Sequence, residues 1–187
     1  MRLYSIKFSQ MLSNNLKATT TAQEAGNEPI AARLAAHPFL AGMNSRHLRI
    51  LGQCTMATQF EAGQVIFRAG EPANGFYLLE RGQVVIEEPA QGESEPAIID
   101  LVGAGEPLGW SWLFAPYLWQ FDARAIEPCR ALCLSGIMLR LHRDEDLFLS
   151  HELFRRASEV MVRRLQAARN RIAGTKKNAC TTGPSSA

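Results

Sequence analysis

This chain of 187 residues lacks long apolar runs, a strong charge of one sign and any dense cluster of metal-binding residues. No 18 apolar residues follow one another, so we expect no membrane-spanning helix. Its 20 basic and 18 acidic residues leave a net charge of +2, too little for a global field that would attract nucleic acid. Hydrophobic residues make up 47% and charged residues 20%, which is typical of a globular chain. This length predicts one domain with short extensions.

The four cysteines follow no zinc pattern, because Cys129 and Cys133 are the single close pair and no second pair or nearby histidine accompanies them. Both lie in a stretch with strand character, where residues four apart are separated by roughly 13 Å. That distance is too long for a disulfide. We therefore expect buried free thiols and a reducing, cytoplasmic location.

Residues for catalysis or metal binding are also scarce. No histidine occurs between His47 and His142, so the middle of the chain lacks the histidine cluster of a metal-dependent cupin-like enzyme. No Ser-His-Asp or Cys-His arrangement is suggested, and the acidic run at residues 144–146 is typical of a helix N-terminus. No G-x-G-x-x-G motif opens a helix. We expect no catalytic site, no metal site and no enzymatic activity.

Composition divides the chain into three parts. Residues 1–29 are predicted to be an N-terminal arm and linker, residues 30–174 the folded domain, and residues 175–187 a disordered tail. The domain opens with predicted helices at residues 30–36 and 45–52, the second with Ser45 as its N-cap.

Residues 55–141 are predicted to form an antiparallel β-roll. Eight glycines between positions 63 and 109 punctuate this region, each beside a short apolar run, and strands at roughly ten-residue spacing between glycine turns are typical of a roll or barrel. The predicted strands are residues 65–67, 76–79, 84–86, 97–99 and 131–134. The fold class is therefore mainly β with flanking helices: a double-stranded β-helix, or jelly roll, with short N-terminal helices and a long C-terminal helix.

After Arg143 the apolar spacing becomes helical and continues for about five turns, some 30 Å. Asp144 is the predicted N-cap, and Gly174 the predicted end of the helix. The apolar stripe consists of Leu153, Phe154, Ala157, Val160, Met161, Leu165, Ala168 and Ile172. Part of this stripe would stay exposed on a monomer, so we predict a parallel homodimer through residues 147–172.

The segment from Phe60 to Ile86 reads FEAGQVIFRAGEPANGFYLLERGQVVI. Its glycines, the I-x-x-x-G-E step and the Y-x-L-x-x-G-x-V strand pair strongly resemble the cyclic-nucleotide-binding domain. The segment Met161–Gln166 also resembles the long helix of catabolite-activator-type regulators, and the resemblance covers residues 38–172. It implies a β-roll that binds a cyclic nucleotide and a helix that pairs two copies.

The ligand-binding cassette departs from this family. The resemblance implies a short helix after Gly109 whose N–H groups hold the cyclic phosphate, a glutamate for the ribose, and an arginine about ten residues later for the phosphate. Trp110 stands in the place of the glutamate and Trp119 in the place of the arginine. All three tryptophans lie within residues 110–119, so they either line a remodelled pocket for a flatter, less anionic ligand or fill the old pocket as core.

In activator-type relatives, small hydroxyl side chains of the long helix cover the base, and Ala168 and Arg169 follow the matching segment here. We hypothesise that Arg124 or Arg169 supplies the missing charge. The candidate ligand-binding residues are Ile99, Gly109, Trp110, Ser111, Trp119, Gln120, Arg124, Ala168 and Arg169. No cofactor is assigned beyond a cyclic nucleotide or a related small molecule.

Two functions are compatible with this sequence. One is a stand-alone regulatory module that senses a small molecule in its roll and signals through protein contacts to a downstream partner. The other is a degenerate dimerising scaffold that binds no nucleotide. Fifteen residues follow Ile172, too few for a helix-turn-helix, so we expect no sequence-specific DNA binding.

Overall fold

A computed structural model describes residues 28–89 and 96–180, with the backbone alone for residues 171–180. The chain forms two compact units, with the boundary after Leu141. The predicted N-terminal arm, apart from Glu28 and Pro29, and residues 181–187 of the predicted tail lie outside the described residues.

Short helices lead into the first unit. They are α2 (Ile30–Ala36), the 3-10 helix η1 (Pro38–Leu40) and α3 (Ser45–Gln53), so both predicted helices are confirmed. The predicted N-cap of α3 was wrong by one residue. Asn44 occupies that place, and its side-chain oxygen accepts a hydrogen bond from the His47 N–H at 2.8 Å. Asparagine and serine are equally good N-caps, so the residue type alone did not decide between neighbours.

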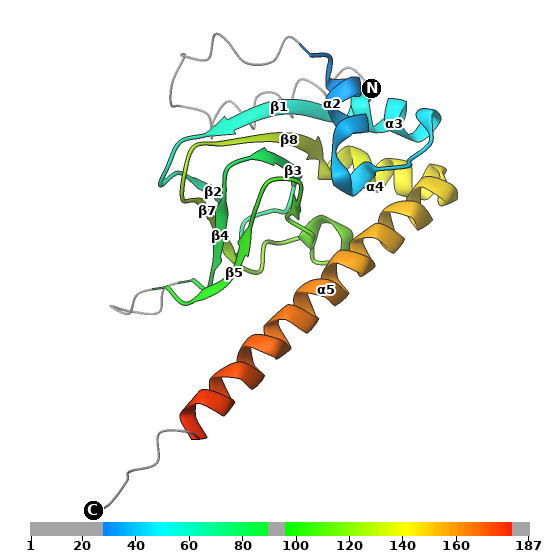
Figure 1. The fold of residues 1–187 in the computed structure, drawn as a ribbon. Helices are drawn as coiled ribbons and strands as arrows, with labels where there is room; N and C mark the ends of the chain where they lie inside the picture. Colours follow the sequence, from blue (N-terminus) through cyan, green and yellow to red (C-terminus); the bar gives the residue numbers. More distant parts are fainter. Residues whose placement is uncertain (1–27, 90–95, 181–187) are drawn as a thin grey trace, which may run out of the picture. The chain divides into compact units, whose positions relative to one another are not determined.

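Two four-stranded antiparallel sheets form the β-roll (Figure 1). The strand orders are β1-β8-β3-β6, called sheet A here, and β2-β7-β4-β5, called sheet B. The strands are β1 (Thr55–Phe60), β2 (Val65–Phe67), β3 (Gly75–Arg81), β4 (Val84–Glu87), β5 (Ile98–Val102), β6 (Pro107–Leu108), β7 (Asp122–Ala125) and β8 (Cys129–Ser135). The predicted fold class is confirmed, although β1, β6 and β7 were not among the predicted strands.

Sheet A separates two apolar cores, because successive residues of a strand point to opposite faces. Tyr77 and Leu79 of β3 belong to the core inside the roll. Phe76 points to the outer face, where its ring lies 5.5 Å from that of Phe39 in η1. The N-terminal helices therefore cover the outer face of sheet A. A side chain on β3 enters one core or the other according to its place in the alternation.

The turn between β3 and β4 shows why the motif needs its glycines. Gly82 has φ +91°, a conformation that L side chains rarely adopt. A Cβ atom there would also lie 2.6 Å from the carbonyl oxygen of Pro128. Gly82 thus allows the hairpin to pass close to the start of β8.

The cysteines of the first unit behave as predicted. Cys54, Cys129 and Cys133 are free and buried, and the last two both lie in β8, where a disulfide between them is excluded by strand geometry. Burial raises the pKa of Cys54 to about 11 and that of Cys133 to about 12, so both thiols stay protonated.

Helix α4 (Gly136–Glu145) contains the unit boundary, and α5 (Leu147–Cys180) belongs to the second unit. Residues 136–141 were predicted as part of the β region, and this was wrong. The predicted cap Asp144 was also wrong, because the carboxylate of Asp146 accepts the Leu149 N–H at 3.0 Å. Within the described residues, no helix is long and apolar enough to cross a membrane.

Helix α5 does not end at Gly174 but continues to Cys180, so residues 175–180 are helical rather than disordered. An interior glycine costs a helix only about 1 kcal/mol, and the neighbouring alanines and lysines are good helix formers.

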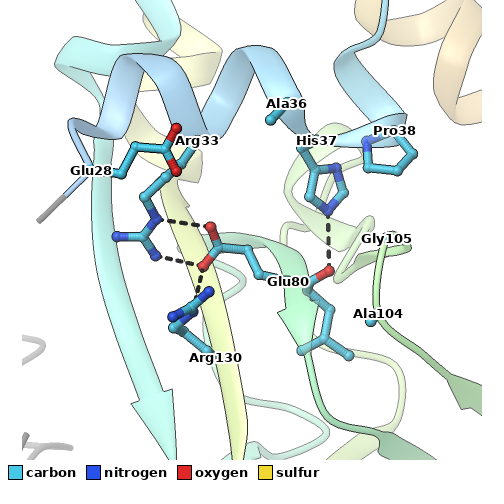
Figure 2. A pocket seen from close by; sticks show the side chains of 10 residues that line it. Glu28, Arg33, Ala36, His37, Pro38, Glu80, Ala104, Gly105 and Arg130 are labelled. Carbon is cyan, nitrogen blue, oxygen red and sulfur yellow. Dashed lines mark hydrogen bonds and ion pairs between the residues drawn. The ribbon is translucent and has the colours of Figure 1, made fainter. Parts of the chain in front are cut away.

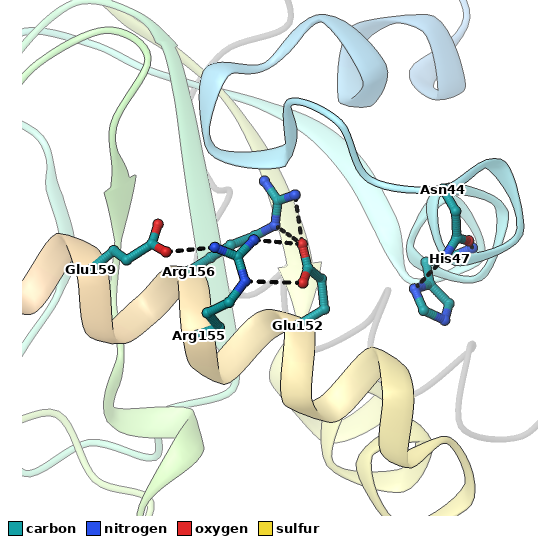
Figure 3. A network of polar contacts seen from close by, with 6 residues as sticks. All are labelled: Asn44, His47, Glu152, Arg155, Arg156 and Glu159. Carbon is teal, nitrogen blue, oxygen red and sulfur yellow. Dashed lines mark hydrogen bonds and ion pairs between the residues drawn. The ribbon is translucent and has the colours of Figure 1, made fainter.

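Ion pairs link successive turns in the first half of α5. Arg155 donates hydrogen bonds to Glu152 and to Glu159 (Figure 3). These contacts at spacings of three and four residues stiffen the helix.

Candidate ligand site

The cassette starts where β6 ends. Leu108 belongs to the core inside the roll, and Gly109 follows with φ +88°. The next residues form the 3-10 helix η2 (Ser111–Leu113), with Trp110 at its N-cap. This is the short helix that the resemblance implied, reduced to a single turn. Ser111 is half-buried and is its first residue.

Trp119 occupies the space beside Gly109. A Cβ atom added at Gly109 would lie 2.9 Å from two carbon atoms of the Trp119 ring. Trp119 is only 5% exposed and stacks on Phe67, with ring centroids 3.8 Å apart and planes 12° apart. The residue in the place of the phosphate arginine is therefore an apolar ring in the core inside the roll, packed against the cassette glycine.

Trp110 lies on the other side of sheet A. Its ring is 5.0 Å from Phe76 and 5.7 Å from Phe39, both in the outer core. Trp112 is 2% exposed and lies 5.8 Å from the same Phe76 ring. The three tryptophans therefore do not line one pocket. Trp110 and Trp112 fill the outer core, and Trp119 alone enters the roll.

Arg124 does not face the space that Trp119 fills. Its neighbours Ala123 and Ala125 belong to the core inside the roll, so Arg124 points to the outer face of sheet B. There its guanidinium donates two hydrogen bonds to Glu87, one of them from Nε to Oε2 at 3.2 Å. This hydrogen-bonded carboxylate raises the pKa of Arg124 above its ordinary value. Arg124 is thus placed away from the cassette and is already paired.

The remaining candidates are scattered. Ile99 is 38% exposed on β5. Gln120 is exposed, and its side-chain amide donates to the carbonyl of Leu118 at 3.2 Å. Ala168 and Arg169 belong to α5 in the second unit, where Ala168 is half-buried and Arg169 is exposed. Within the first unit the structure brings together Gly109 and Trp119.

The aromatic partners of Trp119 were not among the predicted site residues. Phe67 provides the stacking surface, and Tyr77 stacks on Phe67 from 6.1 Å. Phe67 was predicted only as the last residue of a strand. Alternate residues of a strand face opposite sides, so the sequence did not show that Phe67 faces inward. Tyr77 also contacts Cys133, and burial raises the pKa of both groups. This part of the roll favours neutral groups over anions.

These features define a β-roll of two antiparallel sheets in which a tryptophan side chain packs against the cassette glycine. The sequence profile of the cyclic nucleotide-binding domain matches residues 57–157, more than half of the chain. The chain therefore belongs to the cyclic nucleotide-binding domain family. A search of curated proteins gave no significant match.

Solved structures show the same fold. A putative cyclic nucleotide-binding protein from Geobacter metallireducens GS-15 is 25% identical, with a TM-score of 0.66 over 72% of this chain and 97% of that one. DNR from Pseudomonas aeruginosa is 18% identical, with a TM-score of 0.61 over 78% and 65% of the two chains. The regulatory domain of Toxoplasma gondii PKA, solved with cAMP, is 22% identical, with a TM-score of 0.57 over 70% and 49%.

Proposed function

We propose that this chain is a regulatory, non-catalytic module that has lost the family's mode of nucleotide binding and acts through protein contacts, including contacts with a second copy of itself. The observation that carries this proposal is the packing of Trp119 between Phe67 and Gly109. A cyclic phosphate in the family's position would have to displace this ring. The phosphate would then find no guanidinium group at the position of Trp119 to pair with.

Electrostatics supports the same proposal. Tyr77, which stacks on Phe67, and Cys133, which contacts Tyr77, are neutral, because burial raises the pKa of each well above its ordinary range. A phosphodiester monoanion that enters such surroundings loses hydration without gaining a charged partner. A lost charge-assisted hydrogen bond costs about 1.5–3 kcal/mol, roughly a 10- to 150-fold loss of affinity.

The direct test is calorimetric titration of the full chain with cAMP and with cGMP. We expect no binding of either nucleotide in the micromolar range. Sub-micromolar affinity for either one would contradict the proposal. Arg124→Gln is the control variant. If wild type shows any weak nucleotide binding, this variant should bind with the same affinity, because Arg124 faces away from the cassette.

A sensor of a flat, uncharged molecule is the second candidate. The observation that favours it is the stacking of Trp119 on Phe67. A planar ligand ring could stack on Phe67 in the same way if Trp119 moved aside. Trp119 is followed by the exposed residues Gln120 and Phe121. A metabolite screen that follows tryptophan fluorescence tests this candidate. A ligand that changes the fluorescence of wild type but not of Trp119→Phe supports it.

Helix α5 carries a seam suited to a second copy. Its members follow alternating spacings of four and three residues: Leu147, His151, Phe154, Ser158, Met161, Leu165 and Ala168. Leu147 is 77% exposed and Leu165 is 61% exposed. Val160, part of the stripe predicted from the sequence, is only 4% exposed and lies off this seam. We include a parallel homodimer through the seam in the proposed function.

Light scattering of a matched pair of variants tests the dimer. Leu165→Glu places a charge in the seam and should give a monomer. Gln166→Glu adds the same charge one residue away, off the seam, and should leave the dimer intact. A wild-type chain that stays monomeric at high concentration would overturn this part of the proposal.

A further inference from the structure

Ion pairs accompany arginines in both units of the chain. In the first unit, Arg33 donates to both carboxylate oxygens of Glu80, at 2.8 Å from Nε and 2.5 Å from Nη2 (Figure 2). In the first half of α5, Arg155 donates to Glu152 (Figure 3). The second half of α5, residues 161–180, has no acids of its own for such pairs, because Glu159 is the last acidic residue of the sequence.

The second half of α5 is therefore strongly basic. Its six basic and no acidic residues give a formal charge of +6, and they are Arg163, Arg164, Arg169, Arg171, Lys176 and Lys177. A helix dipole favours cations only within the last turn, which begins at Lys177 here. Arg169 and Arg171 lie more than two turns before the helix ends at Cys180, so the dipole does not account for them.

Four of these bases flank an apolar seam. The seam of α5 continues at its alternating spacing from Met161 through Leu165 and Ala168 to Ile172. In the heptad notation of coiled coils these are a and d positions, and the e and g positions lie directly beside them. Between residues 164 and 176, the e and g positions are Arg164, Arg169, Arg171 and Lys176. Every flanking position of this stretch is therefore basic.

The apolar part of this surface is open to a partner. None of the side chains of residues 161–170 is buried, and Leu165 is 61% exposed. Arg164 already interacts within the chain. The flanking charges that matter for a partner are therefore those of Arg169, Arg171 and Lys176.

A second copy of the chain does not balance these flanks. In a parallel pair of helices, a g position meets the e position five residues further along the other helix. Arg171 would therefore meet Lys176 of the second copy, and like charges opposite each other oppose association. The homodimer proposed above leaves this end of the pair positively charged. The partner that fits these flanks is acidic.

The seam favours a helix over a nucleic acid as this partner. A phosphate backbone is attracted by bases on every face of α5, including Arg163 and Lys177 at the f position on the back of the helix. It offers no row of apolar side chains to cover Leu165. An amphipathic helix with acidic flanks offers both features, because its apolar residues interlock with a and d positions while its carboxylates meet e and g positions.

We propose that residues 161–177 of α5 bind an amphipathic helix of another protein, with an apolar seam and acidic flanking positions. The apolar seam of that helix packs on Met161, Leu165 and Ala168, and its carboxylates face positions 169, 171 and 176. This inference rests on the proposed function, because it names the kind of protein through which the regulatory module acts.

The test is fluorescence anisotropy of a labelled synthetic helix titrated with the full-length chain. The probe is a peptide of about four heptads with leucine at a and d and glutamate at e and g. One control peptide has the same composition in scrambled order, and a second has lysine in place of glutamate. We expect micromolar binding of the acidic amphipathic peptide and at least tenfold weaker binding of both controls. Added salt should weaken the binding, because the flanking charges are exposed to solvent.

Two double variants of the chain separate the flanks from the back of the helix. Arg171→Gln with Lys176→Gln removes one arginine and one lysine from the flanks, and should weaken peptide binding roughly three- to tenfold. Arg163→Gln with Lys177→Gln removes the same charge from the f position of the same helix, and should change binding less than about twofold. Glutamine is a good helix former, so circular dichroism should show equal helix content in both.

Three results would overturn the proposal. They are no micromolar binding of the acidic amphipathic peptide, equally tight binding of the scrambled peptide, and equal losses in the two double variants. Tighter binding of a short single-stranded DNA than of the acidic peptide would also overturn it and assign the surface to nucleic acid. Failure of the proposed function is read separately, as cyclic-nucleotide binding in calorimetry or a wild-type monomer in light scattering.

Discussion

Trp110 and Trp119 lie on opposite faces of sheet A, although nine positions separate them in the sequence. Trp110 packs on Phe76 in the outer core, and Trp119 belongs to the inner core together with Tyr77, the next residue of β3. The two positions that the resemblance assigns to the ribose and the phosphate therefore lie in different cores. A substitution at one tryptophan should leave the packing of the other unchanged.

The first prediction concerns Gly109. Gly109→Ala should lower the free energy of unfolding by about 2–4 kcal/mol, because the new Cβ meets the Trp119 ring in a conformation that alanine also disfavours. The measurement is urea denaturation followed by tryptophan fluorescence. Gly63→Ala is the matched control, since Gly63 has a similar φ of +82° but no atom within 4 Å of an added Cβ.

The control separates strain from contact. Gly63→Ala should cost only about 1–2 kcal/mol, the share due to the backbone conformation. If both variants lost the same stability, the close approach of Trp119 to Gly109 would be unimportant. In a Trp119→Ala background, the extra cost at Gly109 should disappear.

The sequence predicted the roll better than it predicted the site, for a physical reason. Glycine turns and the motif from Phe60 to Ile86 depend on local backbone geometry, and the positions of the glycines in the sequence indicate that geometry directly. The face of sheet A on which Trp110 and Trp119 each pack depends on which β3 residues point to that face and on the single-turn length of η2. No local sequence pattern encodes either feature. Helix α4 was missed because residues 136–141 are mostly apolar, and short apolar runs do not distinguish a buried strand from a helix.

The second prediction is a pH dependence due to His37. The ring accepts the Phe39 N–H at Nδ1, so Nε2 carries the proton that is donated to the carbonyl of Leu79, 3.1 Å away. Burial lowers the pKa of His37 in the folded chain below its unfolded value of about 6.5. The unfolded state then binds more protons in mild acid, so stability should fall as pH drops from about 6.5 through the folded pKa.

Denaturation at several pH values, compared between wild type and His37→Gln, measures this effect. The variant should lose about 1–2 kcal/mol at neutral pH, because it disrupts two buried hydrogen bonds, and its stability should change less between pH 7 and 5. Equal slopes for the two proteins in this range would show that His37 is not the titrating group. Glu80 contributes only at lower pH, since its folded pKa is below its ordinary value.

The third prediction places a further acid-sensitive contact in α5. Hydrogen bonds from Arg155 and then Arg156 lower the pKa of Glu152 to about 2, against the opposing effect of burial (Figure 3). The stabilisation of the folded helix by the ionised Glu152 is present above the unfolded pKa of about 4.3, and it is lost as pH falls through the folded pKa. Glu152→Gln should therefore remove part of the loss of helix seen by circular dichroism between pH 5 and 2. Glu159→Gln, which removes a single partner of Arg155, should have a smaller effect.

The last prediction is a gain of nucleotide binding. Trp119→Arg removes the ring that stacks on Phe67 and places a guanidinium where the family resemblance puts the phosphate partner. Gly109 and the N–H groups that follow it are retained, so we expect cAMP binding that is about tenfold or more stronger than in wild type. Binding stabilises the folded state by mass action, so cAMP should also raise the Tm of this variant. Trp119→Ala is the matched control, because it opens the same space without the charge and should gain much less. Equal gains in both variants would mean that space alone limits binding. No gain in a folded Trp119→Arg variant would mean that the site of Trp119 no longer corresponds to the phosphate position.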